Sequence, residues 1–527
     1  MSVSLDRLSN DTPALLRRVS LTRALFYVTA LYGCVLLWIA PRLPLCDLPQ
    51  HAAQIALLHD LLIHASPWES IVRINYFTPY LTGYGIGVLL SFLMSVNTAL
   101  KLTMTVAYLT QLYLFLELRK RFTDDDRLDW LFVPGFFGFA FIWGFYTFLV
   151  AAPIGMAFVL VAHRFAVQPS WRVAAQVLVV GLVLFFSHGL TFMFSCAIGA
   201  GFLVAEWISK RRTISTLLLT LIPYFLFGAL CVVYSRVTQA NDPLLTQHDF
   251  LQGVAWFPAE RSRFLLYVWG MRKQDFIFLP GTAVMLAAPF LLRRRLNWTN
   301  LCALVPLIVV LVDWVAVPSY AMKIAFLYER FALYLMPAVA IAFSSQGAVN
   351  RNRSDAPPRI FGVSRDTLVS ALLMLSCWWF MGVQTVREHR FSAESAPFET
   401  ILGLMEPGQR AALLILDMKS QAYHFMTYTH YAAWYQAEKH GFVDYNFAWF
   451  SPQPARFRLD ALPAIGPGFD VAPEKFDWMK HQGRIYRYFV VRDTTNQGRT
   501  LLSNSECDIR LVRSIGEWSL FERGACH

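Results

Sequence analysis

The chain has 527 residues, of which 56% are hydrophobic and only 15% are charged, and its formal net charge is +11. A soluble domain carries about 25% charged residues, so this composition excludes an ordinary soluble globular protein. Arginine clusters beside apolar segments account for the net charge, which favours membrane topology over nucleic-acid binding as its cause. Apolar runs of about 18 residues recur, and they predict a mainly α, polytopic transmembrane helical bundle.

The first apolar segment, residues 24–40, follows Arg17, Arg18 and Arg23 and lacks a small-residue cleavage site. It is therefore predicted to be a retained anchor that leaves residues 1–22 in the cytoplasm. Apolar runs with basic flanks predict 11–13 spans within 23–387. The individual predictions are 23–41, 79–96, 99–117, 128–142, 145–163, 173–187, 189–208, 214–235, 276–292, 299–317, 327–344 and 367–386.

The arginine pattern contains one conflict about topology. Twelve spans would place both chain ends on one side, whereas the flanking charges place the N-terminus inside and the C-terminus outside. One assignment between residues 42 and 127 must therefore be wrong. Either one apolar run there is re-entrant, or the basic residues 119–121 lie outside.

The first predicted outer loop, residues 42–78, carries Asp47, Pro49 and His51 immediately before a helical run, 52–64. This run has an apolar face, with polar residues such as Asp60 mostly off it. We expect a helix that lies along the membrane surface and presents polar groups to a cavity. An aspartate at the start of a helix is also favoured by the helix dipole alone, so Asp47 has a purely structural alternative.

Two further regions are predicted to lie outside the membrane. The loop 236–275 is polar and aromatic and includes His248 and Asp249, so it is either a lid or an ordinary connection. Residues 388–527 are predicted to form a small extracytoplasmic α/β domain, with buried strands at 413–416 and 488–491 and a hairpin around 514–516. Cys507 and Cys526 lie in this domain and could pair in an oxidising compartment.

Ionisable groups in or beside membrane spans are costly, and so they mark candidate functional residues. Each has a structural alternative, such as a helix cap for His188 or an interfacial anchor for the pair Glu329 and Arg330. All are predicted to converge on the outer face with Asp47 and His51. The complete set there is His188, Asp313, Lys323, Glu329 and Arg330.

These residue types suit transfer from a lipid-linked phosphate donor. Asp47 can act as a general base on an acceptor hydroxyl, and His51 can assist it. Arg330 and Lys323, with His188, can bind the donor phosphate, because a guanidinium pairs two phosphate oxygens. Glu329, Asp313 and Asp60 are then predicted to be supporting residues.

At these residues the sequence resembles the polytopic C-type (GT-C) glycosyltransferase superfamily. The resemblance covers most of the chain loosely and is carried by short stretches. They are the Asp-x-Pro-x-His stretch 47–51, Trp143 to Leu149 with Pro153, residues 187–190, residues 329–331 with Pro337, residues 430–435 with Gly441, and residues 518–523.

The resemblance implies a helical bundle whose first outer loop carries the catalytic acid, which maps onto Asp47. It also implies a polyprenyl-phosphate sugar donor, a glycan, lipid or protein acceptor, and an inverting displacement on the outer face of a bacterial inner membrane. Many members carry a second carboxylate nearby in that loop, whereas here the nearest are Asp60 and Glu69. The need for a divalent cation, Mg²⁺ or Mn²⁺, therefore stays open.

Two other functions compete with the transferase. A flippase or transporter for a lipid-linked glycan should show inverted repeats and broken helices near the midplane, and the sequence shows neither. A non-catalytic membrane scaffold would tolerate the loss of Asp47. The sequence favours the transferase, because its ionisable residues collect at the outer edge rather than at mid-membrane.

Overall fold

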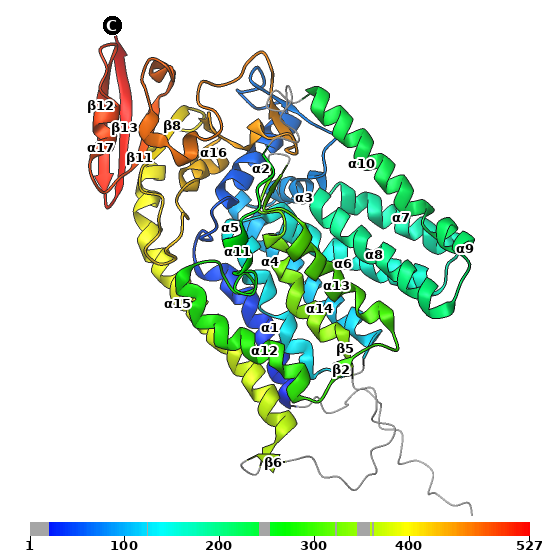
Figure 1. Cartoon of the computed structure of the whole chain (residues 1–527). Coiled ribbons are helices and arrows are strands. Elements are labelled where there is room, and N and C mark those ends of the chain that lie inside the picture. The colour runs from blue at the N-terminus through cyan, green and yellow to red at the C-terminus, as the bar shows by residue number, and fades with distance from the viewer. Residues whose placement is uncertain (1–20, 124, 242–252, 322–323, 345–358, 361–362) are drawn as a thin grey trace, which may run out of the picture.

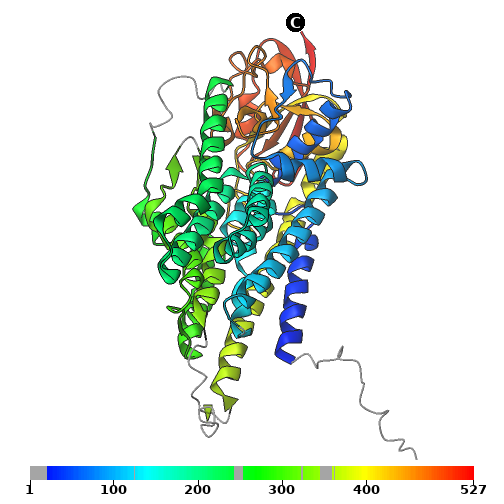
Figure 2. The ribbon, with the colours of Figure 1, turned by 90° about the vertical axis from the view of Figure 1, so that its right-hand side faces the viewer.

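The computed structural model describes residues 21–123, 125–241, 253–321, 324–344, 359–360 and 363–527. A helical bundle forms most of the molecule, and a smaller domain with a β-sheet lies at one end of it (Figures 1 and 2). We call residues 405–527 the sheet domain. The long helix α15 (Arg365–Leu404) runs through the bundle and ends beside the sheet, so the predicted domain boundary at residue 388 falls inside one continuous helix.

Within the described residues, six helical segments are long and apolar enough to cross a membrane, or seven if a bent pair is one span. Serine or threonine side chains cap the starts of several, such as Ser95 before α4 and Ser364 before α15. The six are α1 (Leu21–Ile39), α4 (Val96–Lys120), α6 (Tyr146–Val167), α8 (Gly189–Lys210), Lys273–Leu291 with α12 (Leu279–Leu291), and α15; the bent pair is α9 (Ile214–Thr220) with α10 (Ile222–Asn241).

The other predicted spans are shorter or broken. They include α3 (Leu81–Ser91), α7 (Trp171–Phe185), α13 (Val305–Ala316) and α14 (Leu335–Ala342), which follows the 3-10 turn η5 (Glu329–Tyr334). Residues 128–142 form only short turns, η1 (Arg127–Phe132), η2 (Gly135–Phe137) and α5 (Phe139–Trp143). A side chain at Gly135 would meet the Leu333 carbonyl oxygen at 2.6 Å, so this segment is apolar because it is tightly packed inside the bundle.

Helix α3 resolves the topology conflict. Both of its ends are bound to one neighbouring helix, α2 (Leu48–Leu62): His51 Nδ1 lies 2.6 Å from the Tyr84 hydroxyl, and His59 Nδ1 lies 2.7 Å from Ser91 Oγ. Helix α3 therefore stays at the end of the bundle where α2 lies, and the predicted span 79–96 is wrong. Its apolar residues pack on α2, which hydropathy cannot distinguish from a short span.

The two ends of α1 agree with this correction. At its start, Arg23 is paired with Asp129, which also binds Arg119 at the end of α4. At its other end, Lys101 of α4 donates to the Ala40 carbonyl at 2.5 Å. Helices α1 and α4 are thus antiparallel neighbours, and the basic residues Arg23 and Arg119 lie at the same end of the bundle, as their charge predicts.

Helix α2 is almost completely enclosed, with thirteen of its fifteen residues buried. The apolar face of α2 is therefore covered by protein, and the helix presents one polar residue, Gln50, to a pocket. Its partner is the sheet domain: Leu57 and Leu61 pack with Phe442 and Phe457. The first loop adds β1 (Val72–Ile74), which pairs antiparallel with β10 (Ala455–Phe457) of the sheet domain.

The sheet domain has five strands in the order β12-β13-β11-β8-β9. Strand β8 (Arg410–Ile415) is parallel to β11 (Tyr488–Arg492) and to β9 (Phe442–Val443), and β12 (Cys507–Ile515) forms a hairpin with β13 (Trp518–Cys526). Strands β8 and β11 and the β12–β13 hairpin are the predicted ones, whereas β9 is not among the predictions. A disulfide joins Cys507 to Cys526 at facing ends of that hairpin. Helix α16 (Trp434–Lys439) packs on α2, and α17 (Gln497–Leu501) follows β11.

Buried amide groups fix the sheet domain on α2, and this predicts a stability effect. Gln54 Oε1 accepts from the Ala455 backbone N–H at 3.3 Å, and Gln54 is fully buried. In Gln54→Leu that N–H loses its acceptor, which should cost about 1–3 kcal/mol. We expect a lower melting temperature and faster proteolysis of the sheet domain. Exposed Gln421, replaced in the same way, is the control, and equal effects of both changes would contradict this role for Gln54.

Candidate functional site

Asp47 lies at the start of α2, between the bundle and the sheet domain. It is the N-cap residue, the position that the helix dipole favours for an aspartate, and its side chain accepts no capping hydrogen bond. Its backbone N–H donates to the Trp143 carbonyl at 2.9 Å. Gly144 adopts φ +81°, and a Cβ there would meet the Asp47 nitrogen at 3.0 Å. The segment at 143–144 therefore positions Asp47, and only glycine fits this close approach.

One side chain of the sheet domain, His430, faces Asp47, and a second one, Asp470, lies next to His430. His430 Nε2 lies 3.5 Å from Asp47 Oδ1 and 3.9 Å from Asp470 Oδ2. His430 precedes the 3-10 turn η7 (Tyr431–Ala433), and Asp470 lies in η9 (Phe469–Val471). The site thus has a second carboxylate, Asp470. It comes from the sheet domain and not from the first outer loop, where the family pattern has it.

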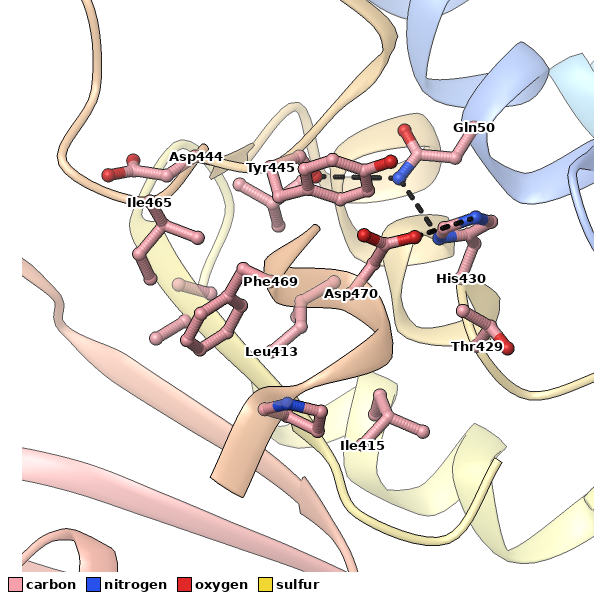
Figure 3. A pocket seen from close by; sticks show the side chains of 14 residues that line it. Gln50, Leu413, Ile415, Thr429, His430, Asp444, Tyr445, Ile465, Phe469 and Asp470 are labelled. Carbon is pink, nitrogen blue, oxygen red and sulfur yellow. Dashed lines mark hydrogen bonds and ion pairs between the residues drawn. The ribbon is translucent and has the colours of Figure 1, made fainter. Parts of the chain in front are cut away.

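Gln50 determines which His430 nitrogen carries the proton. Gln50 Oε1 accepts from the Phe447 backbone N–H at 3.2 Å, which leaves the amide nitrogen to face His430 Nδ1 at 3.5 Å and the Tyr445 carbonyl at 3.4 Å (Figure 3). Nδ1 is then an acceptor, so the proton of neutral His430 lies on Nε2 and points to the two carboxylates.

The electrostatics of this cluster make Asp47 a candidate base. Burial and then the negative charge of Asp470 raise the pKa of Asp47 to about 7, although the Arg330 guanidinium lowers it. Burial also raises the pKa of Asp470, and it lowers the pKa of His430 to about 3. Two adjacent carboxyl groups in a buried site resist simultaneous ionisation. At neutral pH, Asp47 is therefore close to the point where it exchanges a proton most readily.

His51 is buried beside the cluster and is bound within the protein. Its Nδ1 lies 2.6 Å from the Tyr84 hydroxyl, and its ring packs at 5.2 Å from Phe447. Burial lowers the pKa of His51 to about 3, so this histidine is neutral at physiological pH. It lies close to the candidate site and its contacts support helix α2, while its predicted catalytic role stays a prediction.

Arg330 lies on the bundle side of Asp47. Its Nε and one terminal nitrogen each donate at 2.7 Å to the carbonyls of Phe326 and Ala325, and its guanidinium lies over the Phe145 ring at 4.3 Å. Among the described residues, its other terminal nitrogen has no hydrogen-bond partner. The guanidinium of Arg330 is held in place by two backbone carbonyls and by an aromatic ring. Its remaining terminal nitrogen can therefore bind an anion without rearrangement of the side chain.

The remaining predicted residues divide into three groups. His188 caps α8, where its Nδ1 accepts from the Thr191 N–H at 3.3 Å, and it stacks on Tyr80. Asp313 and Glu329 are buried near Arg330, and each has one carboxylate oxygen without a hydrogen-bond partner among the described residues. Asp60 lies at the far end of α2, roughly 20 Å along the helix from Asp47, paired with His440.

Three predicted residues are not described: Lys323 of the phosphate-binding set, and His248 and Asp249 of the proposed lid. They lie outside the described ranges, so their predicted roles stay predictions.

The candidate metal ligands nearest to the site are Cys46, Asp47 and His430, whose ligand atoms lie within 4.8 Å of one another. This set does not fit Mg²⁺ or Mn²⁺, which prefer oxygen ligands. The Cys46 thiol donates to the Met426 carbonyl, and burial raises its pKa well above the usual value, which disfavours the thiolate that a metal needs. These three side chains therefore do not form a site for either cation, and the mechanism below uses the side chains of the protein alone.

Comparison with known proteins gives a likeness of structure. No family model matches the sequence, and no curated protein matches it. The structure is similar to the crystal structure of ArnT from Cupriavidus metallidurans bound to undecaprenyl phosphate, with a TM-score of 0.54. The alignment covers 94% of this chain and 97% of that chain at 10% identity. At this identity the likeness shows the fold alone, and it agrees with the predicted polytopic helical bundle with a small sheet domain.

Proposed function

We propose that this membrane protein of GT-C fold transfers a sugar from a polyprenyl-phosphate donor to an acceptor hydroxyl, with Asp47 as general base. The observation that carries the proposal is the largely buried Asp47 carboxylate, which makes no capping hydrogen bond, faces His430 Nε2 at 3.5 Å and has a pKa raised to about 7. The relative of similar structure is bound to undecaprenyl phosphate, which supports a donor of this class. Such a lipid and this helical bundle share the membrane as their solvent, so the two can meet there.

The proposed step is a single displacement at the anomeric carbon. Asp47 takes the proton of the acceptor hydroxyl as the acceptor oxygen bonds to the anomeric carbon. The bond from that carbon to the phosphate oxygen breaks, and polyprenyl phosphate leaves with the electron pair. Arg330 stabilises the leaving phosphate through the terminal nitrogen that does not bind the Ala325 carbonyl. One displacement inverts the configuration, while burial and then the negative charge of Asp470 keep the Asp47 pKa near neutrality.

We place the site on the extracytoplasmic face of a bacterial inner membrane. The disulfide between Cys507 and Cys526 supports this, because such bonds persist in oxidising compartments. The basic residues Arg23 and Arg119 lie at the opposite end of the bundle from Asp47, which supports the same orientation by the positive-inside rule.

The pH profile of Asp470→Asn tests the role of the carboxyl pair. A general base must be ionised, so wild-type turnover should rise with pH through about 7. The Asp470→Asn change removes the negative neighbour that raises the Asp47 pKa, so the midpoint should move to lower pH. The assay is release of polyprenyl phosphate from a polyprenyl-phosphate sugar between about pH 5 and 9. The control is Asp460→Asn, whose carboxylate is 81% exposed, and an Asp470→Asn midpoint equal to or above the wild-type value would contradict the role.

A further inference from the structure

We infer that Phe326 is a positioning residue of the site: its backbone turn holds the Arg330 guanidinium, and its ring supports the segment that positions Asp47. This inference rests on the proposed transferase function. It names a residue that acts on the reaction through two other residues.

Phe326 has an unusual backbone conformation. It lies between β4 (Ile324–Ala325) and η5, and its φ is +60°. A positive φ is uncommon for residues other than glycine, and for a bulky side chain it is a genuine outlier. The other described non-glycine residues with a positive φ are all polar or charged. Strained conformations of this kind collect at functional sites, where the surrounding structure maintains them.

The turn at Phe326 serves Arg330. Two consecutive carbonyls, those of Ala325 and Phe326, accept hydrogen bonds from Arg330 at 2.7 Å. The relative direction of these carbonyls depends on the φ and ψ angles of Phe326, because this residue joins the two peptide planes. In an extended strand consecutive carbonyls point to opposite sides, so one guanidinium could not reach both. The turn therefore brings both carbonyls onto Arg330.

The backbone on both sides of Phe326 is fixed by hydrogen bonds. Ala325 faces Tyr320 in the antiparallel pair of β4 with β3 (Tyr320–Ala321). The Leu327 backbone N–H donates to the Ser319 carbonyl at 3.2 Å. These contacts hold the two ends of the turn, so packing of the Phe326 ring is what remains to hold its centre.

The ring of Phe326 connects this turn to Asp47. The ring centroid lies 4.6 Å from that of Trp143 and 5.5 Å from that of Phe139. Trp143 provides the carbonyl that accepts from the Asp47 backbone N–H at 2.9 Å. Phe326 thus contacts Arg330 through its carbonyl and the segment that positions Asp47 through its ring. It fixes the spacing between the proposed phosphate-binding group and the proposed base.

An ordinary packing role is the alternative, and the two roles predict opposite orders for two substitutions. Glycine adopts a positive φ readily, whereas a β-branched valine strongly disfavours it. Valine keeps more apolar volume than glycine, so at a position that only packs, glycine should be the more harmful change. At a position whose turn directs Arg330, valine should be the more harmful change.

The test measures equilibrium binding of undecaprenyl phosphate and turnover of a polyprenyl-phosphate sugar by the full-length protein in nanodiscs. Phe326→Val should weaken undecaprenyl phosphate binding by about ten-fold, and Phe326→Gly by less than about three-fold. Turnover at saturating donor should fall about ten-fold in Phe326→Gly, because without the ring the spacing from Asp47 is no longer fixed.

The matched control is Phe425, whose ring contacts the same Trp143 ring at 5.0 Å and whose φ is not positive. There the order should be that of a packing residue, with undecaprenyl phosphate bound no more tightly by Phe425→Gly than by Phe425→Val.

The outcomes separate this inference from the proposed function. Equal losses of affinity in both Phe326 variants, or a larger loss in Phe326→Gly, would overturn the role of the turn, and unchanged turnover in Phe326→Gly would overturn the link to Asp47. If Phe326→Val does not fold, Phe326→Asn and Phe326→Leu decide, because asparagine tolerates a positive φ and leucine keeps the apolar volume. Tighter binding by Phe326→Asn supports the inference, and tighter binding by Phe326→Leu overturns it.

The wild-type protein tests the proposed function in the same assays. The expected order of affinities together with no turnover of any donor would leave the role of Phe326 at Arg330 standing and refute the transferase. Wild type that binds no undecaprenyl phosphate would refute the proposed donor, and this inference with it.

Discussion

Asp47→Asn is expected to lower the turnover of a polyprenyl-phosphate sugar by roughly a thousand-fold, within the 10²–10⁴-fold that general-base catalysis contributes. Asparagine keeps the size of the side chain but cannot accept the acceptor proton. Donor affinity should stay within about two-fold of wild type, because the proposed donor contact is Arg330. The measurements are release of polyprenyl phosphate and, separately, equilibrium binding of undecaprenyl phosphate.

The matched control for this prediction is Asp60→Asn, which changes the same residue type in the same helix. Asp60 pairs with His440 at the far end of α2, so its replacement should leave turnover near the wild-type value. Equal turnover in Asp47→Asn and wild type would remove Asp47 from catalysis and favour a scaffold or a transporter. Equal losses in both variants would indicate a structural effect on α2.

Arg330→Ala is expected to weaken undecaprenyl phosphate binding by about 10–100-fold, since a hydrogen bond to a charged group contributes about 1.5–3 kcal/mol. Arg330→Lys should recover little of this affinity. The guanidinium of Arg330 donates to the carbonyls of Ala325 and Phe326 and has a third nitrogen left for the phosphate. The ammonium group of lysine has only one nitrogen and cannot make all of these contacts.

The control for charge alone is Arg172→Ala, at an exposed position at the start of α7. Its affinity for undecaprenyl phosphate should equal that of wild type. If Arg330→Lys binds undecaprenyl phosphate as tightly as wild type, the site requires a positive charge and not the geometry of a guanidinium. Unchanged affinity in Arg330→Ala would exclude Arg330 from the donor site.

The sequence predicts the architecture well and its membrane register less well. Strands β8 and β11 and the β12–β13 hairpin follow directly from short apolar runs bounded by turns. The segments 79–96 and 128–142 are both apolar, but the first packs on α2 and the second is a tightly packed series of 3-10 turns and one short α-helix. Hydropathy reports only that a segment avoids water, and protein packing satisfies that condition as well as lipid does.

The sequence predicts only those residues of the candidate site that stand out from their immediate neighbours in the chain. Asp47 is identified by its neighbours Pro49 and His51, and Arg330 by its place at the start of a span. Asp470 has no such signal, because it lies in an irregular segment of the sheet domain. It lies next to His430 within the sheet domain, and it acts on Asp47 because that domain docks on α2. His430 belongs to the stretch 430–435 that carries the resemblance, and an ionisable residue in an apolar, aromatic run could have indicated its role.

The most direct test of the central claim measures donor turnover by the wild-type protein alone. Purified protein in nanodiscs is incubated with undecaprenyl-phosphate derivatives of several hexoses, pentoses and amino sugars, and released undecaprenyl phosphate is quantified. The account predicts saturable binding of undecaprenyl phosphate and its release from at least one donor, with a rate that rises with pH through about 7. Absence of binding to undecaprenyl phosphate and to every donor would contradict it.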